Sequence, residues 1–210
     1  IEVVPNGVDE VHFAPAPGTP EPATLVFEGS MDFEPNADAA EYLCRELLPR
    51  IHARRPDVKV LLVGRDPTPA VRALASDSVT VTGWVDDVRP YVARASLFVC
   101  PLRSGAGIKN KILQAWSMGK AVLATSVSVG GLEVHDGENI VLRDDPDRFV
   151  DAVIELLADP ARCQQIGERA RQTVQRGYRW QARTAQFAAV LASIAAPRAA
   201  RLAEGRPPVG

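Results

Sequence analysis

The stretch at residues 101–114 (PLRSGAGIKNKILQ) combines cations with glycines ahead of a segment that has helical periodicity. The residues that can do chemistry here are Arg103, Gly105, Gly107, Lys109 and Lys111. The first turn of a helix presents unpaired N–H groups and the positive end of the helix dipole, so it favours a bound anion. Arginine can add two parallel hydrogen bonds to a phosphate, and lysine adds a point charge. The stretch predicts a diphosphate site, with a solvated basic helix face as the alternative.

Polar and aromatic residues near this stretch suggest the rest of a ligand site. Gln114 lies three residues beyond Lys111 and shares its helix face, where an amide can hydrogen-bond a polyol. The pair Gly130-Gly131 can present backbone N–H groups to an anion. Glu133 can accept from a ligand hydroxyl or amine, or it is a surface carboxylate beside a histidine. Trp84 stands where an aromatic base can stack, although core packing is the stronger reading of a single tryptophan.

Several other chemistries are disfavoured. The spacing does not fit the Walker motif, and no Gly-x-Gly-x-x-Gly follows the first predicted strand, which argues against a nicotinamide dehydrogenase. Ser30 and Ser104 lack the Gly-x-Ser-x-Gly elbow of a hydrolase. The three cysteines and three histidines are scattered, so we expect neither a disulfide framework nor a metal site built by the protein.

Short apolar runs separated by helical patterns must position these residues. The predicted strands are residues 24–28, 58–63, 79–82, 97–100, 121–125 and 140–142, and the predicted helices include 39–51, 69–75, 107–118 and 146–158. This alternation predicts an α/β fold with a doubly wound, Rossmann-like parallel six-stranded sheet that carries helices on both faces. Ligands of such sheets bind at the carboxyl ends of the strands, near the point where strand order reverses.

The remaining chain divides by composition. Residues 1–22 form an N-terminal segment and Pro-rich connector, 23–160 the sheet domain, 161–196 a C-terminal helical extension with helices at about 161–176 and 181–195, and 197–210 a frayed tail. The 210 residues are 46% hydrophobic with a net charge of −2, which excludes disorder over the whole length and gives no support for nucleic-acid binding. Residues 161–210 hold nine arginines and two glutamates. This basic end predicts a surface that meets an acidic partner, or a solvated helix face.

Taken in order, several motifs resemble the C-terminal, donor-binding half of a GT-B-fold glycosyltransferase of the large retaining family 4. They are VVPNGVD at 3–9, FEGS at 27–30, LVG at 62–64, TGWVDD at 82–87, the stretch 101–125 and YRW at 178–180. The resemblance covers about residues 1–195. Each motif is weak alone, and their order and spacing together are specific.

The resemblance implies a transferase that uses a nucleotide-sugar donor, in exopolysaccharide or cell-envelope glycan synthesis, without a metal or other cofactor. By position it places the base at Trp84 and Val85 and the ribose at Gln114. It places the donor sugar at Gly29, Ser30 and Glu133. The diphosphate would meet Arg103, Gly105, Gly107, Lys109, Lys111, Gly130 and Gly131. It assigns no catalytic residue.

Two departures from the family pattern are informative. The family's two glutamates, with seven residues between them, correspond to Ala106 and Gln114. A neutral amide is a weaker acceptor than a carboxylate, so donor affinity should be lower. The basic Arg…Lys-Gly arrangement after the first strand is replaced by Pro35-Asn36.

The resemblance also implies what lies outside this sequence. The glycan or lipid-linked acceptor would bind an N-terminal domain that the sequence lacks, so this chain alone should bind nucleotide weakly and transfer nothing. We expect a cytoplasmic location, with peripheral contact between the basic C-terminal helices and the inner face of the membrane. Two alternatives remain: a GT-B-like nucleotide-sugar epimerase, and a non-catalytic nucleotide-binding or interaction module.

Overall fold

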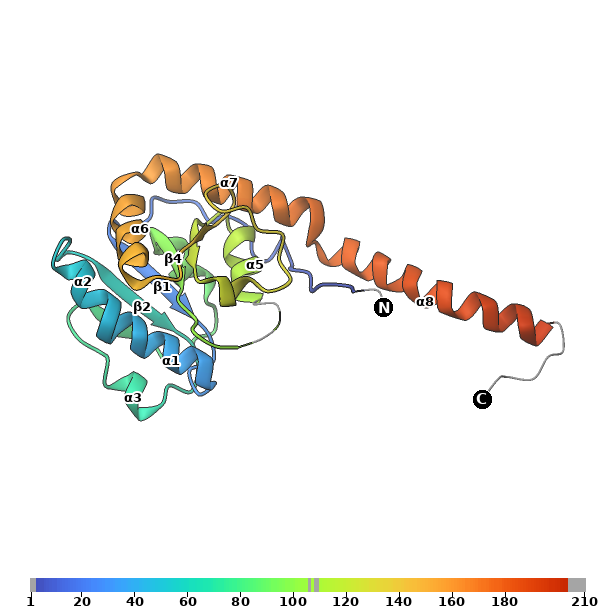
Figure 1. The fold of residues 1–210 in the computed structure, drawn as a ribbon, viewed down its shortest axis with the longest axis horizontal. Coiled ribbons are helices and arrows are strands. Elements are labelled where there is room, and N and C mark those ends of the chain that lie inside the picture. The colour runs from blue at the N-terminus through green and yellow to red at the C-terminus, as the bar shows by residue number, and fades with distance from the viewer. Residues whose placement is uncertain (1–2, 106, 108–109, 204–210) are drawn as a thin grey trace.

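The computed structural model describes residues 3–105, 107 and 110–203, with only the helical backbone described beyond residue 195. Its centre is a six-stranded parallel sheet in the order β3-β2-β1-β4-β5-β6 (Figure 1). The strands are β1 (Thr24–Glu28), β2 (Lys59–Val63), β3 (Val79–Val81), β4 (Leu97–Cys100), β5 (Val122–Ala124) and β6 (Val141–Leu142). The predicted doubly wound, Rossmann-like sheet is confirmed, and strand order reverses between β1 and β4.

The two central strands explain why the sheet is buried on both faces. All four residues of β4 are buried, as are the first four of β1, because every position is apolar except Thr24. Parallel strands covered by helices on both sides lack the polar–apolar alternation of half-exposed strands. In the register, Leu25 lies opposite Leu97 and Val26 opposite Phe98. This pairing brings the carboxyl ends of β1 and β4 side by side.

Helices cover both faces of the sheet. They are α1 (Glu34–Tyr42), α2 (Leu48–His52), α3 (Pro69–Arg72), α4 (Arg89–Arg94), α5 (Asn110–Ser117), α6 (Pro146–Ala158), α7 (Pro160–Gly177) and α8 (Trp180–Ala203). Helix α2 packs beside α6, and α5 packs beside α7. Two of the longer helices begin at aspartates, because Asp145 accepts from the N–H of Arg148 and Asp159 from that of Arg162.

The helix expected at 39–51 differs from the prediction in two respects. It begins earlier, at Glu34, and a π-helical turn, η1 (Leu43–Leu47), separates α1 from α2. The N–H of Leu48 bonds to the carbonyl of Leu43, five residues earlier. Pro49 follows at once, and a proline ring cannot accept the normal helical position of the carbonyl four residues before it. The wider turn accommodates this ring, so the chain continues as one helical run.

Helix α8 departs from the body of the protein, as Figure 1 shows in red. It continues to Ala203, beyond the predicted end at 195 and into the segment expected to be a frayed tail. At its base the N-terminal segment crosses the chain: the N–H of Val8 donates to the carbonyl of Tyr178, and that of Trp180 donates to the carbonyl of Val8. Among the described helices, none is both long enough and apolar enough to cross a lipid bilayer.

Lys120 closes the carboxyl end of α4. Its Nζ donates to the carbonyl of Ala93 at 2.6 Å and to that of Ala95 at 2.7 Å, so it pairs backbone oxygens that the end of a helix leaves open. Burial of this ammonium lowers the pKa of Lys120 to about 8, and the neighbouring Cys163 opposes the shift. The folded protein therefore loses this proton at a lower pH than the unfolded chain, whose lysine has a pKa near 10.5.

A pH-dependent stability follows from this difference. Between these two pKa values the unfolded chain binds more protons than the folded one, so the free energy of unfolding should rise with pH across this window, by on the order of 2 kcal/mol. In Lys120→Met that rise should be absent. Urea unfolding of both proteins from about pH 7.5 to about pH 10 measures the difference. Parallel stability curves for the two proteins would contradict the prediction.

Candidate functional site

A cavity of about 350 Å³ opens at the point where strand order reverses. We call it the β1–β4 cavity. Its lining residues come from the end of β1, the start of α1 and the first turns of α5: Glu28, Gly29, Ser30, Phe33, Pro35, Asn36, Leu102, Asn110, Lys111 and Gln114. Three residues that the sequence assigned to different parts of one ligand, Gly29, Lys111 and Gln114, therefore line the same cavity.

The ammonium of Lys111 is fixed in this cavity. Lys111 Nζ donates to Asn36 Oδ1 at 2.7 Å and lies 4.5 Å from the centre of the Phe27 ring. The amide nitrogen of Asn36 donates in turn to the carbonyl of Ser30 at 2.9 Å. A Cβ at Gly29 would lie 2.7 Å from Asn36 Nδ2 and 2.7 Å from Lys111 Nζ, so glycine is required there to let both heads approach the backbone. The result is a held cation beside exposed main chain, which suits an anion.

Glu28 adds a carboxyl group to the same cavity. It is the last residue of β1 and is partly buried, and this burial raises the pKa of the Glu28 carboxyl group, with the charge of Lys111 acting in the opposite direction. Sequence analysis gave Glu28 no role, because it read the FEGS motif at 27–30 only as the end of an otherwise apolar strand. It missed Asn36 as a functional residue for a similar reason, noting only that it stands where relatives carry a cation.

The edge of the sheet continues from the cavity towards β3. Arg65, which follows β2, donates from Nε to Ser30 Oγ at 2.8 Å and adds an exposed cation that sequence analysis did not single out. Thr82 joins the ends of β2 and β3, accepting from the N–H of Gly64 and donating to the carbonyl of Gly83. Strands lie about 4.8 Å apart, so β3 is roughly 10 Å from β1, a distance that a nucleotide can span.

Trp84 stands at the far end of this edge, and 67% of its surface is exposed. The expectation that a single tryptophan is packed in the core is wrong, because the chain turns outward after β3 and carries the ring into solvent. Val85, next to it, is partly buried against the core. The structure thus leaves Trp84 exposed and available for stacking, after a strand that lies two positions from β1 in the sheet.

Arg103 does not line the β1–β4 cavity. Its guanidinium makes two hydrogen bonds to Asp38, at 2.5 and 3.0 Å, reaches Glu46 at 3.4 Å and lies 4.5 Å from the Tyr42 ring centre. All three partners belong to α1 and η1, so the charge is directed at the helical layer. The Arg103 guanidinium holds the pKa of the Asp38 carboxyl group below its usual value.

This geometry predicts a small role for Arg103 in anion binding. Arg103→Ala should weaken binding of a nucleoside diphosphate by less than about threefold and lower the free energy of unfolding by about 0.5–1 kcal/mol near pH 7, as is usual for half-exposed ion pairs. The Asp38 contribution is present above the carboxyl pKa of the unfolded chain and is lost as pH falls through the depressed value of the folded state. The destabilisation should therefore shrink in acid, as urea unfolding at about pH 7 and about pH 3 can measure. A tenfold loss of nucleotide affinity would contradict this assignment.

The loops after β4 and β5 approach each other. A Cβ on Gly130 would lie 4.0 Å from the carbonyl of Gly107, and Gly105, Gly107 and Gly131 all have positive φ. Two buried hydroxyl groups join these loops: Thr125 Oγ1 donates to the carbonyl of Leu102 at 2.5 Å, and Ser128 Oγ to that of Cys100 at 2.7 Å. The predicted positions Ala106 and Lys109 lie outside the described residues.

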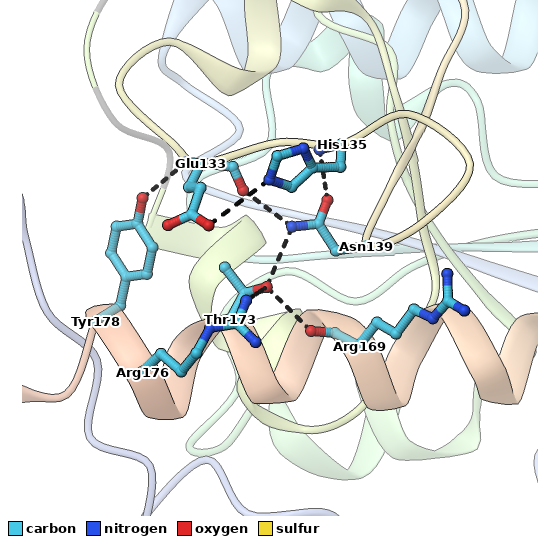
Figure 2. A network of polar contacts seen from close by, with 7 residues as sticks. All are labelled: Glu133, His135, Asn139, Arg169, Thr173, Arg176 and Tyr178. Atoms are coloured by element: carbon cyan, nitrogen blue, oxygen red, sulfur yellow. Dashed lines mark hydrogen bonds and ion pairs between the residues drawn. The ribbon is translucent and has the colours of Figure 1, made fainter.

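Glu133 belongs to a separate polar network, drawn in Figure 2. Its backbone N–H donates to the hydroxyl of Tyr178 at 2.7 Å, and its carbonyl accepts from the amide of Asn139 at 2.9 Å. The exposed carboxylate lies 3.6 Å from His135 Nε2. Asn139 also reaches Thr173 on α7, so the network fastens the loop after β5 to that helix. The side chain of Glu133 is thus not among the residues that line the β1–β4 cavity.

The chain resembles known proteins in sequence and in fold. Residues 22–159 match the family described as glycosyl transferases group 1. The phosphatidyl-myo-inositol mannosyltransferase of Mycolicibacterium smegmatis is 33% identical over 202 residues, which are 91% of this chain and 51% of that protein.

Solved structures agree on the fold. Sucrose-phosphate synthase from Thermosynechococcus elongatus superposes with a TM-score of 0.75 at 25% identity, over 93% of this chain and 53% of that one. Anabaena HepE in complex with UDP and glucose gives a TM-score of 0.76 at 18% identity, over 91% of this chain and 56% of that one. The chain thus spans about half the length of the relatives it matches. A matching family model over most of its length, with the doubly wound sheet found here, shows that the chain belongs to the group 1 glycosyltransferases.

Proposed function

We propose that the chain binds the nucleoside diphosphate of a nucleotide-sugar donor in the β1–β4 cavity and supplies the donor half of a glycosyltransferase site. The observation that carries this proposal is the Lys111 ammonium, held by Asn36 beside the backbone of Gly29 in a cavity at the switch point of the sheet. Ligands of doubly wound sheets bind at this point. A fixed cation there suits a phosphate better than a neutral ligand.

The donor fits along the carboxyl edge of the sheet. Its diphosphate would lie on Lys111 and the loops that contain Gly29, Gly107 and Gly130, with the ribose near Gln114. The base would extend across β2 towards Trp84 and Val85, where an exposed ring is available for stacking. Arg65 stands between these two ends, beside Ser30. The Anabaena HepE structure, which has the same fold and was solved in complex with UDP and glucose, supports a donor of this class.

In transfer, the site would act by electrostatics. Negative charge develops on the nucleoside diphosphate as its bond to the sugar breaks, and a cation already in position stabilises that charge without reorganising. Lys111 is placed to do so because Asn36 and the Phe27 ring restrain its ammonium. We propose no metal for this step. The groups that bind and activate the acceptor would come from parts of the enzyme that this chain does not span.

The acceptor is proposed to be a glycan or a lipid-linked sugar of the cell envelope. The relative from Mycolicibacterium smegmatis is a phosphatidyl-myo-inositol mannosyltransferase, which supports a lipid-linked acceptor. Peripheral contact with the cytoplasmic face of a membrane would bring the enzyme to such an acceptor.

Calorimetric titration with UDP, GDP and ADP tests the proposal on the chain as it is. We expect micromolar to submillimolar binding of at least one nucleoside diphosphate, at least fivefold weaker binding of the matching monophosphate, and loss of affinity as salt is raised. The matching nucleoside without phosphate serves as the control. Failure of all three diphosphates to bind at millimolar concentration would overturn the proposal.

A further inference from the structure

Glu28 is an acid that has no hydrogen-bond or ion-pair partner among the described residues. It is the only acidic residue among those that line the described β1–β4 cavity, and within the described part of the chain its carboxylate makes no hydrogen bond or ion pair. Partly buried carboxylates elsewhere in the structure are paired: Asp38 with Arg103, and Asp87 with Arg89. Withdrawing a carboxyl group even partly from water without a partner is unfavourable, so a ligand that supplies hydrogen-bond donors would be favoured there.

The place of Glu28 limits what that ligand group can be. The residue ends β1 and lines the cavity, close enough to Lys111 for the two charges to influence each other. Gln114, one helical turn beyond Lys111, lines the same cavity. A phosphate can therefore be bound by the cation while a hydroxyl-bearing ring fills the space between the acid and the amide.

Gln114 and Glu28 differ as hydrogen-bond acceptors for the hydroxyl groups of a ligand. The amide oxygen of Gln114 can accept a hydrogen bond from a hydroxyl, although more weakly than an ionised group does. A carboxylate can accept from both hydroxyl groups of a vicinal diol at once. In this cavity α5 carries the neutral Gln114, and the negative charge is on Glu28 at the end of β1.

We infer that Glu28 is a ribose-binding residue, which accepts hydrogen bonds from the 2′- and 3′-hydroxyl groups of the nucleotide and supplies the anionic acceptor that position 114 lacks. This role rests on the proposed binding of a nucleoside diphosphate in the β1–β4 cavity. Lys111 lies beside the acid and offsets the repulsion between the carboxylate and the phosphates. The ligand completes the hydrogen bonding of a group that the protein alone leaves open.

The test compares two ligands that differ only in the diol. Wild-type protein and Glu28→Gln are titrated with the best-binding nucleoside diphosphate and with its 2′,3′-dideoxy analogue. Wild type should bind the dideoxy ligand at least tenfold more weakly than the ribonucleotide, and in Glu28→Gln this ratio should fall to about twofold. The dideoxy ligand should bind both proteins equally. Glu155→Gln, which removes the same charge from an exposed position on α6, should keep the wild-type ratio.

A rescue experiment distinguishes ribose binding by Glu28 from a general structural effect of its substitution. Glu28→Gln combined with Gln114→Glu moves the acid from the end of β1 to α5 within the same cavity and should restore the ratio to at least fivefold. Glu28→Gln should also unfold at a higher temperature than wild type without ligand, because the variant no longer buries an unpaired acid. If it fails to fold, Glu28→Asp keeps the charge and shortens its reach, and should reduce the ratio without changing affinity for the dideoxy ligand.

The outcomes distinguish the two proposals. Wild type that binds ribonucleotide and dideoxynucleotide equally, or a ratio unchanged in Glu28→Gln, overturns the role of Glu28 and leaves diphosphate binding standing. An equal loss of affinity for the ribonucleotide and the dideoxy analogue in Glu28→Gln also overturns the role of Glu28, because the substitution then does not act through the 2′- and 3′-hydroxyl groups. Wild type that binds no nucleotide overturns both.

Discussion

Lys111→Ala should weaken binding of a nucleoside diphosphate at least 30-fold. The substitution removes a cation that Asn36 and the Phe27 ring hold at the β1–β4 cavity, and hydrogen bonds to charged groups contribute about 1.5–3 kcal/mol each. A loss of about 2 kcal/mol corresponds to about 30-fold in the dissociation constant. Calorimetric titration at low salt gives the two constants. The effect should be smaller with the monophosphate, which offers less negative charge to the same ammonium.

Lys59→Ala is the matched control, because it removes the same charge from an exposed residue at the opposite end of β2. It should change affinity by less than about twofold at moderate salt, since exposed charges beyond a Debye length are screened. Circular dichroism of both variants checks that the fold is kept. Equal affinity of wild type and Lys111→Ala would remove the central support for the proposed site.

Gly167→Ala should lower the free energy of unfolding by about 3 kcal/mol. A Cβ at this position would lie 2.0 Å from the carbonyl oxygen of Gly119 and 2.7 Å from its carbon, where α7 meets the chain that leaves α5. Both contacts are with backbone, so α7 must move away from α5 to relieve them. Forcing extra atoms into a close-packed contact typically costs about 1–3 kcal/mol or more. Urea unfolding followed by circular dichroism measures the change.

Gly177→Ala is the control within the same helix. Its added Cβ would meet only the end of the Arg183 side chain, at 3.5 Å, which can rotate away. Alanine also favours the helix over glycine by about 0.5–1 kcal/mol, so this variant should be as stable as wild type or slightly more so. Comparable loss of stability in both variants would show that the Gly119 contact is not what makes Gly167 necessary.

The sheet was predictable because its signal is local. The runs at 24–28 and 97–100 are apolar except for Thr24 and Glu28 at the ends of the first, and glycine or proline follows each; the structure places strands at both. Helix ends were less predictable. The π-helical turn before Pro49 could not be predicted from the sequence, because several local backbone conformations can accommodate a proline ring. The end of α8 was also missed, because its alanine-rich segment up to Ala203 has a composition that fits a frayed end as well as a helix.

Arg103 shows why the site was only partly predictable. Its neighbours in sequence are glycines and lysines, which favour a phosphate role, but its partners Asp38 and Glu46 come from a helical run some 60 residues earlier. Which anion an arginine meets depends on tertiary packing that no local pattern encodes. Lys111 could be singled out from the sequence because a cation on a helix face follows from short-range periodicity, whereas Gly29 was singled out only through the family resemblance.

The pairing of β1 with β4 also sets the order in which the protein can assemble. Leu25 and Leu97 are partners although about 70 residues of chain separate them, and closing so long a loop is a slow, entropically opposed event. Both walls of the cavity depend on that closure, so a chain that has folded only its first two strands has nowhere to hold a nucleotide. Nucleotide should therefore slow unfolding while leaving the refolding rate almost unchanged, which makes the ligand a reporter of the last contacts to form.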